Sequence, residues 1–62
     1  MRQFELASFG EIPELGDHKP DETDECGWTV AMTLAVKNIE IPDQWKHDPL
    51  IRNNYGYTVA LL

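Results

Sequence analysis

Hydrophobic positions in the middle of the chain recur at the spacing of a helix. Between Val30 and Lys37 the apolar side chains stand four residues apart, so a helix here would be apolar on most sides and would pack between neighbours. Thr29 is placed to cap this helix, because its hydroxyl can accept a hydrogen bond from a free amide of the first turn. Asn38 can adopt the left-handed conformation that ends a helix. The apolar pairs are Val30 with Leu34, Ala31 with Ala35, and Met32 with Val36.

The beginning of this segment is repeated at the end of the chain. Residues 27–31 read Gly-Trp-Thr-Val-Ala, and residues 56–60 read Gly-Tyr-Thr-Val-Ala, 29 positions later. When the whole chain is shifted by 29 residues, nine of the 33 aligned positions are identical. Such self-similarity indicates a solenoid-type repeat, in which each unit buries its apolar face against the next. The identical residues of the first copy are Glu11, Ile12, Pro13, His18, Pro20, Gly27, Thr29, Val30 and Ala31.

The repeat also predicts the N-terminal elements. Residues 4–9 align with the second half of the central helix, so a short N-terminal helix is expected, with Gly10 as its stop signal. Pro13 is placed to begin a short second turn of helix. Residues 16–26 contain almost no apolar side chain, and we expect them to form a solvated connector.

After the central helix, a proline again precedes a short helical segment. Residues 42–46 should form about one and a half turns of helix, and Trp45 is its expected anchor to the core. Leu50 and Ile51 are then expected to pack, and a polar loop leads to a second helix cap at Thr58.

The length of 62 residues allows one domain. We expect an all-α fold, a short helical-hairpin repeat with long polar connectors. The predicted units are an acidic N-terminal half-repeat or cap over residues 1–26, a central repeat over residues 27–55, and the start of a further repeat over residues 56–62.

The single cysteine, Cys26, excludes an intrachain disulfide and favours a cytosolic protein. We expect it to be a partly buried small residue rather than a reactive thiol, because neighbouring acids disfavour a thiolate. No stretch approaches the roughly 20 apolar residues of a membrane span, and the N-terminus lacks the apolar run of a signal peptide. The sequence predicts no membrane association.

The net charge of −6 comes entirely from the first 26 residues, since the acids and bases of residues 27–62 balance. Such a field disfavours direct contact with nucleic-acid phosphates and favours a partner with a basic surface. The acids of the connector lack the alternate spacing and central glycine of a calcium loop. They remain either a solvated loop or a docking surface, formed by Asp17, Asp21, Glu22, Asp24 and Glu25.

The repeated motif resembles a known repeat family. Residues 27–35, Gly-Trp-Thr-Val-Ala-Met-Thr-Leu-Ala, follow an acidic loop and are similar to the Gly-x-Thr-Pro-Leu-His-x-Ala signature of ankyrin repeats. Val30 stands where that signature has proline, Met32 stands where it has histidine, and the period is 29 rather than about 33. The resemblance is to a degenerate ankyrin-like repeat. It implies a stack of helical hairpins used for protein binding, and it brings no catalytic residues.

Two histidines occupy equivalent places in the repeat. His18 and His47 each stand two residues before a proline, and residues that recur once per repeat usually maintain it, so we expect them to stabilise turns. With Cys26 they lack the spacing of a zinc site. No arrangement of nucleophile, base and acid can be assembled either. We therefore predict neither an enzyme nor a cofactor.

The aromatic side chains gather near the repeated glycine, where they could anchor a protein partner. Packing within the repeat is an equal explanation for them. An alternative from another functional class is a small acidic phage-type inhibitor that mimics nucleic acid and blocks a defence or regulatory protein. Self-association through the apolar C-terminal end is a further possibility. The predicted partner-binding residues are Asp24, Glu25, Trp28, Asn53, Asn54, Tyr55 and Tyr57, with Asp17, Asp21 and Glu22 as acidic docking residues.

Overall fold

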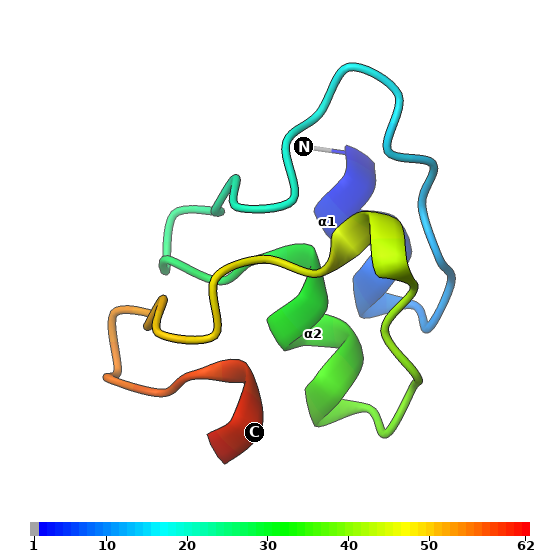
Figure 1. Ribbon diagram of the computed structural model, residues 1–62. Helices are drawn as coiled ribbons and strands as arrows, with labels where there is room; N and C mark the ends of the chain where they lie inside the picture. The colour runs from blue at the N-terminus through cyan, green and yellow to red at the C-terminus, as the bar shows by residue number, and fades with distance from the viewer. Residues whose placement is uncertain (1) are drawn as a thin grey trace.

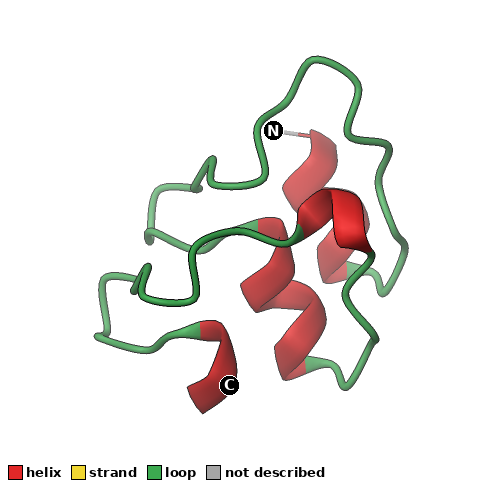
Figure 2. Cartoon of the chain, viewed as in Figure 1, coloured by secondary structure: helices red, strands yellow, loops and turns green. Residues whose placement is uncertain are grey.

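The computed structural model describes residues 2–62, and within them every regular element is helical. Two α-helices, α1 (Arg2–Ser8) and α2 (Val30–Val36), are followed by two short 3₁₀ turns, η1 (Asp43–Trp45) and η2 (Val59–Leu61). Long loops join them (Figure 2). The predicted all-α class is confirmed. Over these residues, no helix has the length and apolar character needed to cross a membrane.

Helix α2 lies at the centre of the molecule, with α1 against it on one side and η2 on another (Figure 1). This position explains its apolar surface, since Val30, Ala31, Met32 and Leu34 are all buried. The predicted helix is confirmed to within one residue at its C-terminal end, which is the usual uncertainty of a helix boundary.

The ends of α2 have the predicted caps. The Thr29 hydroxyl accepts a hydrogen bond from the Met32 amide at 3.1 Å, and the Thr29 amide donates to the Met32 sulfur at 3.5 Å, which completes a capping box with an unusual acceptor. At the other end Asn38 has a φ of 59° and its amide donates to Ala35 O. A left-handed residue satisfies the last carbonyls of the helix in this way.

The core joins the two halves of the chain through Trp45. Its side chain is 1% exposed and packs in the same cluster as Phe4 of α1 and Leu34 of α2. The indole Nε1 donates a hydrogen bond of 2.7 Å to the carbonyl oxygen of Pro13, 32 residues earlier in the chain. The predicted role of Trp45 as a core anchor is confirmed.

Two local predictions were wrong. Residues 11–15, which include Pro13, form no helical turn, and the Pro13 carbonyl accepts the indole hydrogen bond instead. Leu50 does not pack, since it is 79% exposed. The Asp48 side chain accepts a hydrogen bond from the Leu50 amide at 2.9 Å, and this tight turn leaves the leucine side chain outside, while Ile51 is half-buried.

Cys26 is also placed differently from our expectation. It is exposed rather than partly buried. Its amide donates to the Asp24 carboxylate at 2.9 Å, so the residue lies in a tight polar turn and not against the core.

Candidate protein interface

Two loops, residues 24–28 and 53–57, have the same backbone hydrogen bonds. In the first, the Asp24 amide donates to Trp28 O at 2.9 Å. In the second, the Asn53 amide donates to Tyr57 O at 2.9 Å. Each loop is thereby closed at its base, and we refer to the pair as the paired loops.

The side chain at the first position of each loop holds the turn from inside. Asp24 Oδ1 accepts hydrogen bonds of 2.9 Å from the amides of Cys26 and Trp28. Asn53 Oδ1 accepts from the amides of Tyr55 and Tyr57 at 2.9 and 3.0 Å. Short side-chain oxygens of Asp and Asn commonly organise turns in this way. The two sites therefore differ in charge but not in geometry.

The paired loops lie side by side at one edge of the molecule and are bonded through Asn54 (Figure 1). The Asn54 amide donates to Cys26 O at 3.0 Å, and its side-chain Nδ2 donates to Glu25 O at 3.3 Å. Gly27 permits this approach, because a Cβ atom there would lie 2.6 Å from Asn54 Oδ1. The two loops therefore form two adjacent layers of one surface, and hydrogen bonds hold the backbone of each layer.

Most of the predicted partner-binding side chains reach solvent on this surface. Tyr55 is 67% exposed and Tyr57 is 49% exposed, and Glu25 and Asn54 are exposed as well. Trp28 is half-buried. The structure thus brings these residues, which are up to 32 positions apart in the chain, to one edge.

Asn53 and Asp24, which were also predicted to bind a partner, are less exposed than the two tyrosines above. Asn53 is only 6% exposed and its side chain holds the turn, so it presents little surface to a partner in this conformation. Its Nδ2 has no hydrogen-bond partner within the described part of the chain. Asp24 is half-buried and one of its oxygens is already engaged. Both residues hold the turns of the paired loops, and only Asn53 is buried.

The acidic connector is partly fastened to the rest of the molecule. Asp17 and Asp21 are exposed, as predicted for docking residues, but Glu22 is half-buried. The Glu22 carboxylate accepts a hydrogen bond of 3.2 Å from the Lys19 amide and lies 3.4 Å from the side-chain amide of Gln3 in α1. His18 Nδ1 lies 3.3 Å from the same carboxylate. Glu22 therefore ties the connector to α1, and His18 supports that turn as expected.

His47 supports the start of α2 from the second half of the chain. Its Nδ1 lies 2.8 Å from the Asp48 carbonyl, which can only accept, so Nδ1 carries a proton. In the neutral ring, Nε2 then accepts a hydrogen bond of 2.8 Å from the Thr29 hydroxyl. The same Thr29 oxygen accepts from Met32, so one hydroxyl joins the helix cap to the following turn.

Thr58 has the backbone of Thr29 without its bonds. The φ and ψ angles are −86° and 167° at Thr29 and −90° and 171° at Thr58. The predicted helix cap at Thr58 was wrong, because its side chain makes no capping hydrogen bond and a 3₁₀ turn follows it instead of an α-helix.

We expect the Thr29→Val substitution to lower the free energy of unfolding by about 1–2 kcal/mol, because it removes a buried N-cap and leaves the Met32 amide unsatisfied. The matched substitution Thr58→Val should have an effect within about 0.5 kcal/mol, because no side-chain bond is lost. Urea denaturation followed by circular dichroism measures both values. Equal effects of the two substitutions would contradict the assigned role of Thr29.

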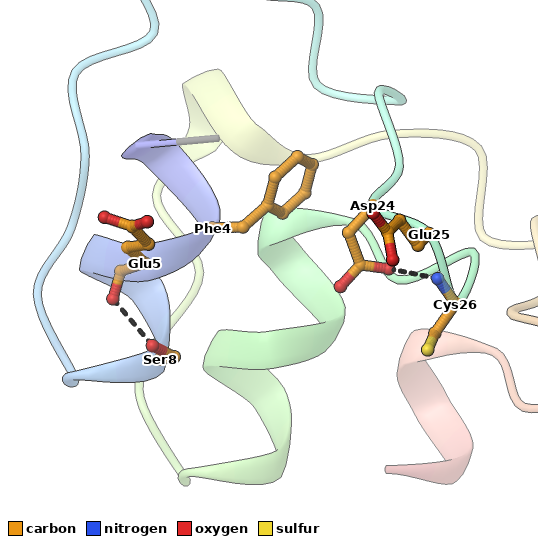
Figure 3. A pocket seen from close by; sticks show the side chains of 6 residues that line it. All are labelled: Phe4, Glu5, Ser8, Asp24, Glu25 and Cys26. Atoms are coloured by element: carbon orange, nitrogen blue, oxygen red, sulfur yellow. Dashed lines mark hydrogen bonds between the residues drawn. The ribbon is translucent and has the colours of Figure 1, made fainter.

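A shallow pocket of about 400 Å³ lies between α1 and the first loop (Figure 3). Phe4 and Glu5 border it from the helix, and Asp24, Glu25 and Cys26 border it from the loop. Sequence reasoning missed the helix side of this pocket, since no motif connects residues about 20 positions apart. Over the described residues, no cluster of three or more histidine, cysteine or acidic side chains is arranged to hold a metal ion.

No protein-family model matches the chain, and neither a curated protein nor a solved structure matches it. The function must therefore be argued from the geometry of the paired loops.

Proposed function

We propose that this chain is an ankyrin-like helical-repeat module that binds another protein through the paired loops. The observation that carries the proposal is the agreement between loops 24–28 and 53–57. They share the same closing bond, the same internal Asp or Asn turn and a left-handed glycine, with φ of 79° at Gly27 and 84° at Gly56. This agreement supports the proposal that the 29-residue step in the sequence is a step from one loop to the next in space.

The paired loops suit a binding surface for a physical reason. Side-chain oxygens and Asn54 fix the backbone, so little loop entropy has to be lost when a partner binds. Tyr55 and Tyr57 present large exposed side chains on that fixed backbone. Rigid aromatic groups are the commonest anchors of protein interfaces. We place Trp28, Glu25 and Asn54 on the same surface.

The charge distribution suggests the chemistry of the partner. The first 26 residues carry the whole net charge of −6, and the exposed acids of the connector lie next to the first loop in sequence. A basic protein surface would be attracted to this side and oriented by it. An exposed, unpaired Cys26 agrees with a reducing compartment, and we propose a cytosolic location.

The nucleic-acid mimic is less well supported. It requires carboxylates that face outward in a row, whereas Glu22 is bonded to the connector and Asp24 to the loop amides. It also predicts binding that falls steeply with salt, while aromatic anchors predict a shallow salt dependence.

Photocrosslinking tests the proposed surface. We expect p-benzoylphenylalanine in place of Tyr57 to form a discrete adduct with one protein in the cells that make this chain. The matched control places the same group at Phe9, which is 79% exposed but lies at the end of α1. The joint replacement of Trp28 and Tyr57 by alanine should weaken binding of the captured protein by about 2 kcal/mol or more, or roughly 30-fold.

The two positions make the result decisive. Adducts of equal yield from both positions would indicate non-specific contacts of any exposed surface. A folded double alanine variant with unchanged affinity would show that Trp28 and Tyr57 are not anchors. Either outcome overturns the assignment of the paired loops as the interface.

A further inference from the structure

The outer edge of the second loop repeats the edge of the first loop to which Asn54 binds. On the first loop, the carbonyls of Glu25 and Cys26 accept the side-chain and main-chain amides of Asn54. The equivalent carbonyls on the second loop, 29 positions later, belong to Asn54 and Tyr55. Within residues 2–62 these two carbonyls accept no hydrogen bond.

The threonine that follows each loop shows the same difference between a bonded first copy and an unbonded second copy. Thr29 is fully buried and bonded to His47, and its oxygen accepts the Met32 amide. Thr58 is only half-buried, and the Leu61 amide, which is equivalent to that of Met32, bonds to the Thr58 main-chain carbonyl at 3.1 Å. The second loop therefore has the backbone of a covered edge without the groups that would cover it.

We infer that this edge, formed by the carbonyls of Asn54 and Tyr55 and the hydroxyl of Thr58, binds a polypeptide turn that presents an asparagine and an imidazole. The edge offers two free carbonyl acceptors at the positions equivalent to Glu25 and Cys26, whose carbonyls bind the two amide groups of the single residue Asn54. It also offers the hydroxyl of Thr58, which is equivalent to the Thr29 hydroxyl that bonds to His47 beside the first loop. This inference rests on the proposed function, and it specifies the chemistry by which a protein partner adds a third layer.

A second copy of the same chain does not meet these requirements. Its first loop has Glu25 at the position of Asn54, and a carboxylate can only accept hydrogen bonds. If the Glu25 carboxylate of a second copy lay against the carbonyls of Asn54 and Tyr55, hydrogen-bond acceptors would face one another and repel each other. The copy's own Asn54 is already bonded within its paired loops. The occupant is therefore a different segment, with an amide where this chain has Glu25.

The test extends the full chain after Leu62 by a further copy of residues 34–62, which is one period of 29 residues. The appended copies of Asn54 and His47 should then reach the free carbonyls and the Thr58 hydroxyl. We expect amide hydrogen exchange at Leu61 to slow by at least about tenfold, because its partner becomes the Thr58 hydroxyl in a full helix turn. NMR on the intact extended chain measures this rate residue by residue.

A matched extension separates recognition from simple lengthening of the helix. It carries Asn54→Asp and His47→Ala in the appended copy only, so the original paired loops are unchanged. We expect this version to lose the added protection at Leu61. Equal protection in both extensions would overturn the asparagine and imidazole requirement, and no protection in either would overturn the edge itself.

Failure of this experiment is distinguishable from failure of the proposed function. Crosslinking from Tyr57 concerns the exposed loop side chains and uses the unextended chain, whereas the exchange rate at Leu61 concerns the edge and needs no partner. A captured protein together with an unprotected Leu61 would retain the interface and reject the third layer.

Discussion

The Trp45→Ala substitution should lower the free energy of unfolding at 25 °C by about 3–5 kcal/mol. Trp45 is 1% exposed, and its loss removes a large side chain from the cluster that joins α1 and α2. Truncation of a buried tryptophan costs about 3–5 kcal/mol. A chain of this length has a stability of only roughly 3–9 kcal/mol at the usual value per residue. The single substitution therefore removes a large share of the stability, or all of it.

Urea denaturation followed by far-UV circular dichroism measures this effect. Trp45→Phe keeps an aromatic ring in the core but leaves the Pro13 carbonyl without its donor, so it should cost about 1–3 kcal/mol. The matched control is Phe9→Ala at a 79% exposed position, which should change stability by no more than about 0.5 kcal/mol. A Trp45→Ala chain that unfolds cooperatively at nearly the original urea concentration would contradict the central role of this residue.

The structure shows where the hydrophobic pattern was sufficient and where it was not. Helix α2 was predictable because its apolar spacing, its Thr29 cap and its Asn38 stop all point to the same element. The proline segments show the opposite case. Residues 11–13 and 40–42 are identical, yet only the second leads into a helical turn.

The difference between these segments lies three residues after each proline. Trp45 stands there in the second segment and is buried, so its turn is held against the core. The equivalent residue of the first segment is Gly16, which has no side chain to anchor a turn. The core thus determines which proline begins a helix, and local sequence identity does not.

The candidate interface was predictable in its location but not in the direction of each side chain. Asp and Asn before a glycine serve either a turn or a partner equally well, and sequence alone cannot separate these roles. The structure assigns Asn53 to the turn and leaves Asn54, its neighbour, to bond the two loops. The pocket between α1 and the first loop was not predictable, because residues about 20 positions apart line it without any motif.

Gly27→Ala and Gly56→Ala form a second pair of substitutions with a large expected difference. Both glycines have φ near 80°, a conformation that costs an L-residue about 1–3 kcal/mol. Only at Gly27 would the added Cβ meet another loop, at 2.6 Å from Asn54 Oδ1 and 3.0 Å from the Asn54 backbone nitrogen. At Gly56 nothing lies within 4 Å. We expect Gly27→Ala to cost about 1–3 kcal/mol more than Gly56→Ala, because Asn54 must move and lose its two bonds.

Urea denaturation of both variants gives this difference directly, and the strain that both share cancels in the comparison. Equal costs would mean that the paired loops separate without loss of stability, and the rigid surface proposed for binding would then have no basis. The chain extended by one period reverses the expectation for Gly56. If an appended asparagine binds beside Gly56 as Asn54 binds beside Gly27, Gly56→Ala should become as costly as Gly27→Ala, since its Cβ would then meet the third layer.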